Sequence, residues 1–321
     1  MKKTVLALML WPFLCFASSA EAQKVYRIGG LVSGDQFWFA FEGFKSRMAE
    51  LGYIEETNVR YDFHNSKGDP ELLKSLANKL VQDKPDLIVT SSTTATLPVA
   101  KATEGTAIPV VFLGVADPLK LVKSYSSSGN NLTGISSSNL ELTDKRLELI
   151  RDLTPKAKTV ICIYNSKGVN YKDHVRLTRE GAKKLGLELV EVDITTREEL
   201  RQKLPALTGK IGDAIFLQPD ALITAGIENI AKQAVAERLP VIPAIVENVR
   251  RGTLAAYSPD YFTIGRQGAM LVDKILKGAK PSHLPIEQPY QLKLVINLKT
   301  ARAIGLKIPK EILLRADEVI E

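Results

Sequence analysis

The chain has 321 residues and carries 43 Lys and Arg against 36 Asp and Glu, a formal net charge of +7. Apolar residues make up 45% and charged residues 25%, a balance that excludes a disordered or collagen-like chain. Charges of both signs are interspersed along the chain, so nothing indicates a nucleic-acid partner. Two Cys and three His are too few for a disulfide scaffold or a Cys/His-rich zinc site, and the length suggests about two domains.

The first segment has the pattern of an export signal. Two lysines precede an apolar run from Val5 to Phe16, and small residues follow as far as Ala20-Glu21-Ala22. This order predicts a secretory signal peptide over residues 1–22, cleaved after Ala22. An apolar run of about a dozen residues is shorter than the roughly 20 that span a bilayer, which argues against a membrane anchor. We therefore expect an exported, soluble mature protein.

The first half of the mature chain alternates between strand and helix patterns. We predict helices over residues 37–51, 70–82 and 94–103, and strands over residues 26–32, 58–63, 86–90, 109–113 and 131–136. Strands that alternate with helices of about 10 to 15 residues are typical of β-α-β units and a parallel sheet. Continuously apolar runs at Leu87–Val89 and Val110–Leu113 indicate strands that helices cover on both faces.

The second half repeats this scheme without a short sequence period. We predict helices over residues 143–153, 171–185, 197–207 and 223–238, and strands over residues 159–164, 187–192, 214–217 and 241–245. Further strands at 254–257 and 290–296 and helices at 262–276 and 298–304 follow. The fold class is therefore α/β, with two Rossmann-like lobes, each built on a parallel sheet of about five strands. Two such lobes leave a cleft that a hinge can close over a small molecule.

The residues directly after each strand are the candidate binding residues, because ligands of open α/β sheets bind beyond the carboxyl ends of the strands. After the third strand, five hydroxyl residues run into a helix. One of them would suffice as a helix cap, so the run favours contact with a carboxylate or another anion. The candidates in this run are Ser91, Ser92, Thr93 and Thr94.

Ser33 and Phe37 follow the first strand, and Asp117 follows the fourth. Phe37 either forms the wall of an apolar ligand site or packs in the core. Asp117 either contacts a ligand or only opens a turn with the proline that follows it.

Polar side chains follow the strands of the second half in the same way. A carboxylate there can pair with a ligand ammonium, and an amide can fix its orientation. A plain turn or cap role remains open for each residue, but the pattern recurs at every strand end. These candidates are Asn165, Gln218, Asp220, Glu247 and Tyr257.

No catalytic group stands out. His64, His174 and His283 are far apart and match no metal-binding spacing, so we expect surface or structural histidines, no metal and no cofactor. Cys162 lies in an apolar run and is expected to be a buried core residue. The residues alone therefore propose no reaction, and an enzyme remains an alternative at this point.

Several stretches resemble one family, the periplasmic solute-binding proteins of ABC importers, of the tryptophan/tyrosine type. The matching stretches cover essentially the whole mature chain and are residues 114–119 with 131–134, 145–150, 257–260, 272–281, and 294–301 with 315–318. The resemblance implies a type I periplasmic binding protein fold, in which three crossovers join two lobes. By that pattern the N-lobe takes residues 24–138 and 254–286, and the C-lobe takes residues 139–253 and 287–321.

The resemblance also implies a function. The ligand would be a small solute that the lobes enclose: first an amino acid, with an aromatic or a branched apolar side chain, and otherwise a related carboxylate. The partners would be the permease and ATPase subunits of the importer, and the protein would be a periplasmic monomer. Val246-Glu247-Asn248 and Tyr257-Ser258-Pro259-Asp260 depart from the usual pattern and bear on which ligand is bound. A ligand-sensing module for a membrane receptor and an exported enzyme with a two-lobed cleft remain alternatives.

Overall fold

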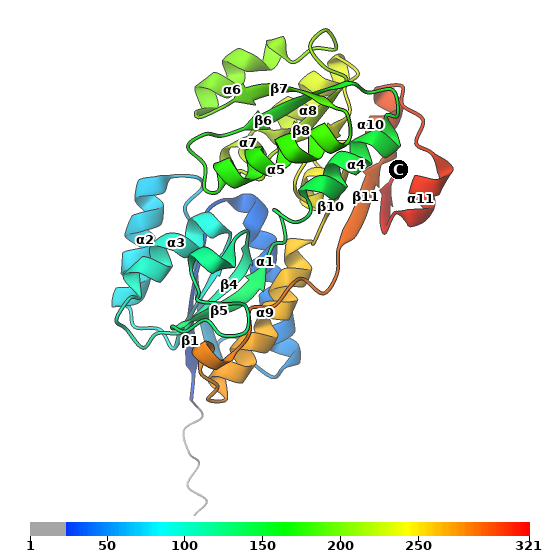
Figure 1. Ribbon diagram of the computed structural model, residues 1–321. Helices are drawn as coiled ribbons and strands as arrows, with labels where there is room; N and C mark the ends of the chain where they lie inside the picture. Colours follow the sequence, from blue (N-terminus) through cyan, green and yellow to red (C-terminus); the bar gives the residue numbers. More distant parts are fainter. Residues whose placement is uncertain (1–23) are drawn as a thin grey trace, which may run out of the picture.

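The structure, a computed structural model, describes residues 24–321. The signal peptide expected over residues 1–22 lies outside the described residues. The described chain forms two lobes that meet end to end, with the first and last parts of the sequence in different lobes (Figure 1). Within residues 24–321, none of the helices has the length and apolar character needed to cross a bilayer.

The N-lobe is built on a parallel sheet of five strands in the order β2-β1-β3-β4-β5. The strands are β1 (Tyr26–Val32), β2 (Val59–Asn65), β3 (Leu87–Ser91), β4 (Val110–Val115) and β5 (Leu132–Ser136). Every residue of β3, β4 and β5 is buried, which the continuous apolar runs predict for β3 and β4.

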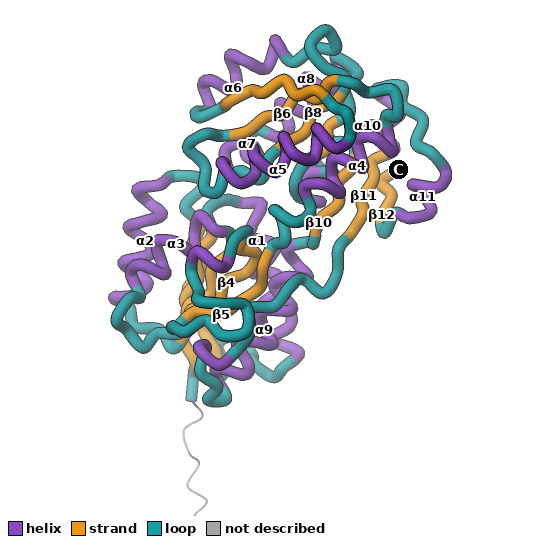
Figure 2. The backbone as a smooth tube through the Cα atoms, in the orientation of Figure 1, coloured by secondary structure: helices purple, strands orange, loops and turns teal. Residues whose placement is uncertain are grey.

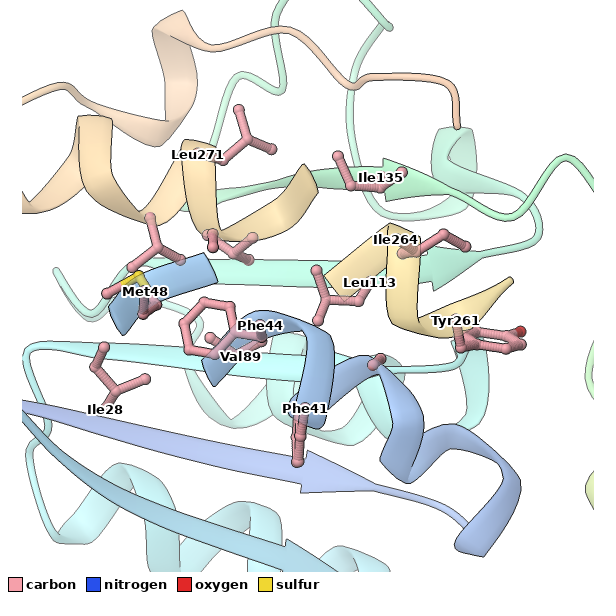
Figure 3. Packing of buried hydrophobic residues seen from close by; sticks show 14 of the residues in the cluster. Ile28, Phe41, Phe44, Met48, Val89, Leu113, Ile135, Tyr261, Ile264 and Leu271 are labelled. Carbon is pink, nitrogen blue, oxygen red and sulfur yellow. The ribbon is translucent and has the colours of Figure 1, made fainter. Parts of the chain in front are cut away.

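Helices cover both faces of this sheet. On one face lie α1 (Trp38–Glu50) and α9 (Tyr261–Leu276), whose apolar residues share a core with Val111 and Leu113. On the other lie α2 (Pro70–Gln82) and α3 (Thr93–Ala102), which pack against Val110 and Phe112. The alternation along β4 follows from the period of two in a strand. Figure 3 shows the first of these cores, in which Phe44 and Leu113 lie between the sheet and the helices.

The helices α1 and α9 come from distant parts of the sequence and pack closely. Gly43 and Gly265 lie at their contact, and a Cβ on Gly43 would overlap the carbonyl oxygen of Phe262. Helix α9 thus belongs to the N-lobe although the strands and helices of the C-lobe sheet precede it in the sequence, as Figure 1 shows.

The C-lobe repeats the arrangement with a parallel sheet in the order β7-β6-β8-β9. Its strands are β6 (Thr159–Tyr164), β7 (Glu188–Asp193), β8 (Ala214–Leu217) and β9 (Val241–Ile242). Its helices are α4 (Thr143–Leu153), α5 (Tyr171–Lys184), α6 (Arg197–Lys203), α7 (Ala221–Ala225) and α8 (Ile227–Ala236). The α/β class with two parallel-sheet lobes is therefore confirmed.

Two C-lobe elements differ from the sequence prediction. In place of the single helix expected over 223–238, α7 and α8 flank Gly226, where a Cβ would overlap Leu200 of α6. The strand expected over 241–245 ends at Ile242, and residues 246–248 form a turn of 3-10 helix.

A third, small sheet contains β10 (Ala255–Ser258), β11 (Lys293–Asn297) and β12 (Glu318–Ile320), with β10 and β11 antiparallel. The helices α10 (Leu298–Ala303) and α11 (Lys310–Arg315) lie beside it. Ala255 and Leu294 share a core with Leu147 of α4, so β10 packs with the C-lobe. The sequence places residues 254–286 in the N-lobe, and from this packing of β10 we propose that the N-lobe resumes only after Ser258.

The chain passes between the lobes three times. It crosses after β5, again between β10 and α9, and a last time along the loop that leads from α9 to β11 (Figure 2). These three connecting segments permit the two lobes to rotate as rigid bodies about one hinge. This rotation is the movement expected of a cleft that closes.

Candidate ligand-binding site

Each sheet has a topological switch point, where successive connections leave the first strand in opposite directions. In the N-lobe this point lies between β1 and β3, and the hydroxyls of Ser33 and Ser92 meet there with their oxygens 2.8 Å apart. In the C-lobe it lies between β6 and β8, and Asn165 Nδ2 donates to Asp220 Oδ2 over 3.1 Å. Ligands of doubly wound sheets bind at such points.

A cavity of about 60 Å³ lies between the two switch points, and both lobes supply its walls. The N-lobe contributes Phe37, Ser92, Thr93, Thr94, Gly114, Ala116 and Ser137, and Asn139 lies in the crossover that follows β5. The C-lobe contributes Val169, Asn170, His174, Pro219, Asp220, Ala221 and Thr224, while Ile245 and Tyr261 close the hinge side. A larger groove of about 800 Å³ adjoins it at Ala221 and includes Ser33, Glu247 and Asn248 in its lining.

The N-terminus of α3 forms the most polar part of the N-lobe wall. Ser92 caps the helix by accepting a hydrogen bond from the amide of Ala95, over 3.2 Å. Its backbone, at φ 85° and ψ 152°, lies in a region that residues other than glycine rarely occupy, and such strain concentrates at binding sites. The hydroxyl of Thr94 makes no hydrogen bond with another of the described residues.

Two features of this wall suit a carboxylate. The first amides of a helix have no acceptor within the helix, and the helix dipole favours negative charge there. The hydroxyl of Thr93 accepts a hydrogen bond from the amide of Ala116 over 2.9 Å, which leaves its own proton to donate. Free amides and two hydroxyls thus face the cavity together.

Asp220 gives the C-lobe wall an unpaired negative charge. Its Oδ1 caps α7 by accepting from the amides of Leu222 and Ile223, at 2.8 and 3.1 Å. Burial raises the pKa of this carboxyl above its ordinary value, although these amides and Asn165 oppose the rise. Among the described residues no Lys or Arg forms an ion pair with it, so a ligand cation would compensate its charge.

An apolar wall completes the cavity. Phe37 and Tyr261 pack edge to face, with ring centres 5.1 Å apart. Gly114 has a φ of +77°, and a Cβ there would lie 2.6 Å from the Tyr261 ring. Glycine is therefore required both by the backbone and by the approach of that ring. Aromatic and aliphatic side chains in this arrangement suit a ligand with a ring.

The structure brings together only some of the residues that the sequence predicted for the site. Five of them line the cavity: Phe37, Ser92, Thr93, Thr94 and Asp220. Ser33 and Glu247 line the adjoining groove, and Asn165 reaches the cavity wall only through its hydrogen bond with Asp220.

The remaining four point elsewhere. Ser91 is a fully buried residue of β3, and the carboxylate of Asp117 faces Lys120 at 3.5 Å. Gln218 is buried beneath α5, where its amide donates to the backbone oxygen of His174 over 3.2 Å. Tyr257 lines a separate hollow on the C-lobe.

Sequence reasoning missed several wall residues, among them Asn139, Asn170, His174, Thr224 and Tyr261. They lie in helices and crossovers, whereas the prediction considered strand ends. His174 was expected to be a surface or satisfied histidine. It is buried, and its Nδ1 has no hydrogen-bond partner within residues 24–321. Cys162 is buried in the core, as predicted.

Glu247 lies in the hinge, at the junction of the groove with α9. Its Oε1 accepts a hydrogen bond from the amide of Tyr261 over 2.8 Å, and its Oε2 has no partner among the described residues. Burial, with a smaller contribution from the Asp260 charge, raises the pKa of its carboxyl to about 7.

Two contacts bridge the lobes at the mouth of the cleft. Lys120 Nζ, from the N-lobe, lies 2.9 Å from the carboxylate of Asp173 and 2.6 Å from Asn170 Oδ1 in the C-lobe. On the other side, Arg197 Nη2 donates to the carbonyl of Lys67 over 3.4 Å. Both contacts require the lobes to be close together.

Two doubly wound lobes, hinged over a cavity that both of them line, define a solute-binding protein of the type I fold. The chain belongs to the family described as ABC transporter substrate binding protein, whose family model matches residues 27–320. The resemblance predicted from the sequence is thereby confirmed, and the protein is a solute-binding component of an ABC transporter.

Known relatives support this assignment. The chain is 33% identical over 292 residues to a tyrosine-binding protein of Clostridioides difficile (strain R20291), covering 90% of this chain and 83% of the relative. It is similar to a Streptococcus pneumonia ABC domain solved in complex with L-Trp, with a TM-score of 0.84, 30% identity, and coverage of 92% of this chain and 100% of that one.

A substrate-binding protein of Clostridium difficile in a ligand-free, open form gives a TM-score of 0.69. Its identity of 31% and its coverage, 92% of this chain and 99% of that one, are nearly the same as for the L-Trp complex.

Proposed function

We propose that this protein is the extracytoplasmic binding subunit of an ABC importer and captures an amino acid with an aromatic side chain. The observation that carries the proposal is the chemistry of the cavity. One wall offers hydroxyls and free amides at the start of α3, the C-lobe wall offers the unpaired carboxylate of Asp220, and the aromatic rings of Phe37 and Tyr261 also line the cavity.

The three parts of an aromatic amino acid match these three walls. Its carboxylate accepts hydrogen bonds from the amide and hydroxyl of Thr94 and from Thr93. Its ammonium pairs with Asp220, which offsets the cost of burying that carboxylate. Its ring packs against Phe37 and Tyr261. The relatives whose names mention tyrosine or L-Trp support the same ligand class.

Capture takes place by closure of the lobes. A cavity of about 60 Å³ has room for about two water molecules, so an amino acid enters only when the lobes part. Contacts from both walls then favour the closed state, and Lys120 adds its bridge to Asp173. The closed form would dock on the permease, and an ATPase subunit would drive import. We infer a periplasmic monomer that catalyses no reaction, exported by the signal peptide expected over residues 1–22.

The proposal is tested by a thermal-shift screen of the twenty amino acids and small carboxylates. The protein is first unfolded and refolded under dialysis, so that no ligand from the expression host remains. A true ligand at 100 times its Kd stabilises the fold by about 2.7 kcal/mol. We expect tyrosine or tryptophan to give the largest shift.

Variants locate the binding site in the same assay. Asp220→Asn keeps the helix cap but loses the charge that pairs with the ammonium, so the shift should fall sharply. Asp83→Asn is the matched control, because this exposed carboxylate pairs with Lys79 on α2 and lies outside the cavity lining. A screen without any amino-acid shift, or an undiminished shift in Asp220→Asn, would contradict the proposal.

A further inference from the structure

His174 contributes the imidazole of α5 to the C-lobe wall of the cavity. The residue is 2% exposed, and its Nδ1 makes no hydrogen bond with any described residue. Buried polar atoms in folded proteins nearly always have a partner. Because His174 is one of the residues that line the cavity, a bound ligand can supply a partner to its ring. The mechanism proposed above leaves this group unused.

The surroundings of His174 keep its ring neutral. Burial is the largest cause that lowers its pKa, to about 3, and the positive charges of Arg146 on α4 and Lys120 across the cleft act in the same direction. Only Asp173 opposes them, while Gln218 donates to the backbone oxygen of His174 and adds no charge. A neutral imidazole has one nitrogen that accepts a hydrogen bond and one that donates.

The charge of Arg146 helps to keep the His174 ring neutral over the ordinary pH range. Its guanidinium is fully buried and donates to the backbone oxygens of Asn139 and Ala244, with no carboxylate paired to it among the described residues. Its pKa of about 10, lowered by burial, leaves it charged at neutral pH. A second positive charge on His174 would be repelled by it.

The other polar groups of an amino acid already have better partners. A carboxylate favours the amides and hydroxyls at the start of α3, and an ammonium favours the charge of Asp220. A neutral acceptor competes poorly for either. What remains for His174 is an uncharged polar hydrogen, such as the O–H of a phenol or the N–H of an indole.

We propose that His174 accepts a hydrogen bond from the polar hydrogen on the ring of the ligand, and that it thereby selects a phenol or an indole over a plain phenyl ring. This inference rests on the proposed function and makes His174 a specificity-determining residue of the same cavity. A site built to accept such a hydrogen rejects an analogue that lacks it, because its own acceptor is then left buried and unpaired.

The test is a cycle of two deletions measured by titration calorimetry. On the ligand, L-phenylalanine removes the hydroxyl of L-tyrosine, and 1-methyl-L-tryptophan removes the N–H of L-tryptophan. On the protein, His174→Leu removes the imidazole. We expect the wild-type protein to bind the donor-bearing member of at least one pair about 10- to 100-fold more tightly, and His174→Leu to reduce that ratio to near one.

Controls make each outcome decisive. His64→Leu, in β2 and outside the cavity lining, should leave the ratio unchanged. His174→Gln supplies an amide acceptor and should restore part of the ratio if His174→Leu folds poorly. Equal binding of both members of each pair by the wild-type protein, or a ratio that His174→Leu leaves intact, would overturn the inference while the proposed function stands. If no aromatic amino acid binds at all, both fail.

Discussion

Glu247→Gln should change how the stability of the protein depends on pH. The carboxyl of Glu247 is 7% exposed, and burial raises its pKa from 4.5 to about 7. Each pKa unit corresponds to about 1.4 kcal/mol, so the rise is worth about 3 kcal/mol of differential stability between the protonated and ionised forms. Glutamine keeps the oxygen that accepts from the amide of Tyr261 and removes the titration.

The sign follows from the direction of the shift. Below pH 4.5 the carboxyl is protonated in both the folded and the unfolded chain, and its contribution to stability is fully present. As the pH rises to about 7, the unfolded chain releases this proton first, so the free energy of unfolding falls. Above about pH 7 both forms are ionised, and the loss of about 3 kcal/mol remains.

Urea unfolding from pH 4 to pH 8 measures this directly. The difference in unfolding free energy between the wild-type protein and Glu247→Gln should change by about 3 kcal/mol across the range, with the wild-type protein losing stability relative to the variant. Glu104→Gln, an exposed residue, is the matched control and should show no such change. Parallel pH profiles for the wild-type protein and Glu247→Gln would refute the reasoning.

Three further predictions concern closure, packing and the buried thiol. Lys120→Met removes the bridge to Asp173, so ligand release should accelerate in stopped-flow measurements. We expect an acceleration of about 1.5- to 5-fold, because an exposed ion pair typically contributes about 0.2–1 kcal/mol. An unchanged release rate would count against a bridge that stabilises the closed form. Gly43→Ala should lower the free energy of unfolding by about 1–3 kcal/mol, because the added Cβ would overlap Phe262. Gly209→Ala is the control: its Cβ would have no atom nearer than 3.7 Å, so the free energy of unfolding should stay nearly unchanged. Burial raises the pKa of the Cys162 thiol to about 12, so this thiol should react with a disulfide reagent only after the chain unfolds. Rapid labelling of the native protein would instead show that the C-lobe core is open.

The parallel-sheet lobes could be predicted from the sequence because their signals are local. Apolar runs such as Val110–Leu113 and helix stops such as Gly52 mark the elements, and alternation of strands and helices implies parallel pairing. The third sheet could not be predicted in this way. Strand β10 reads like the other strands, and only tertiary packing pairs it antiparallel with β11.

The site was predicted by region but not by side chain. The rule that ligands bind beyond strand ends identified the stretch that includes Ser91 and Ser92. It could not decide between these residues, because alternating residues of a strand point to opposite faces and the position of the strand end determines which residue turns into the cleft. Ser91 stays within β3 and Ser92 caps α3. His174 left no signal at all, because a helix residue reaches the cleft only through the packing of α5 on the sheet.

The central claim is that two hinged lobes hold an aromatic amino acid and leave it chemically unchanged. Equilibrium dialysis of the refolded protein against labelled L-tyrosine and L-tryptophan, followed by chromatography of the recovered label, tests it most directly. We expect saturation at one ligand per chain and quantitative recovery of the intact amino acid. Failure of both amino acids to bind, or recovery of an altered compound, would contradict it.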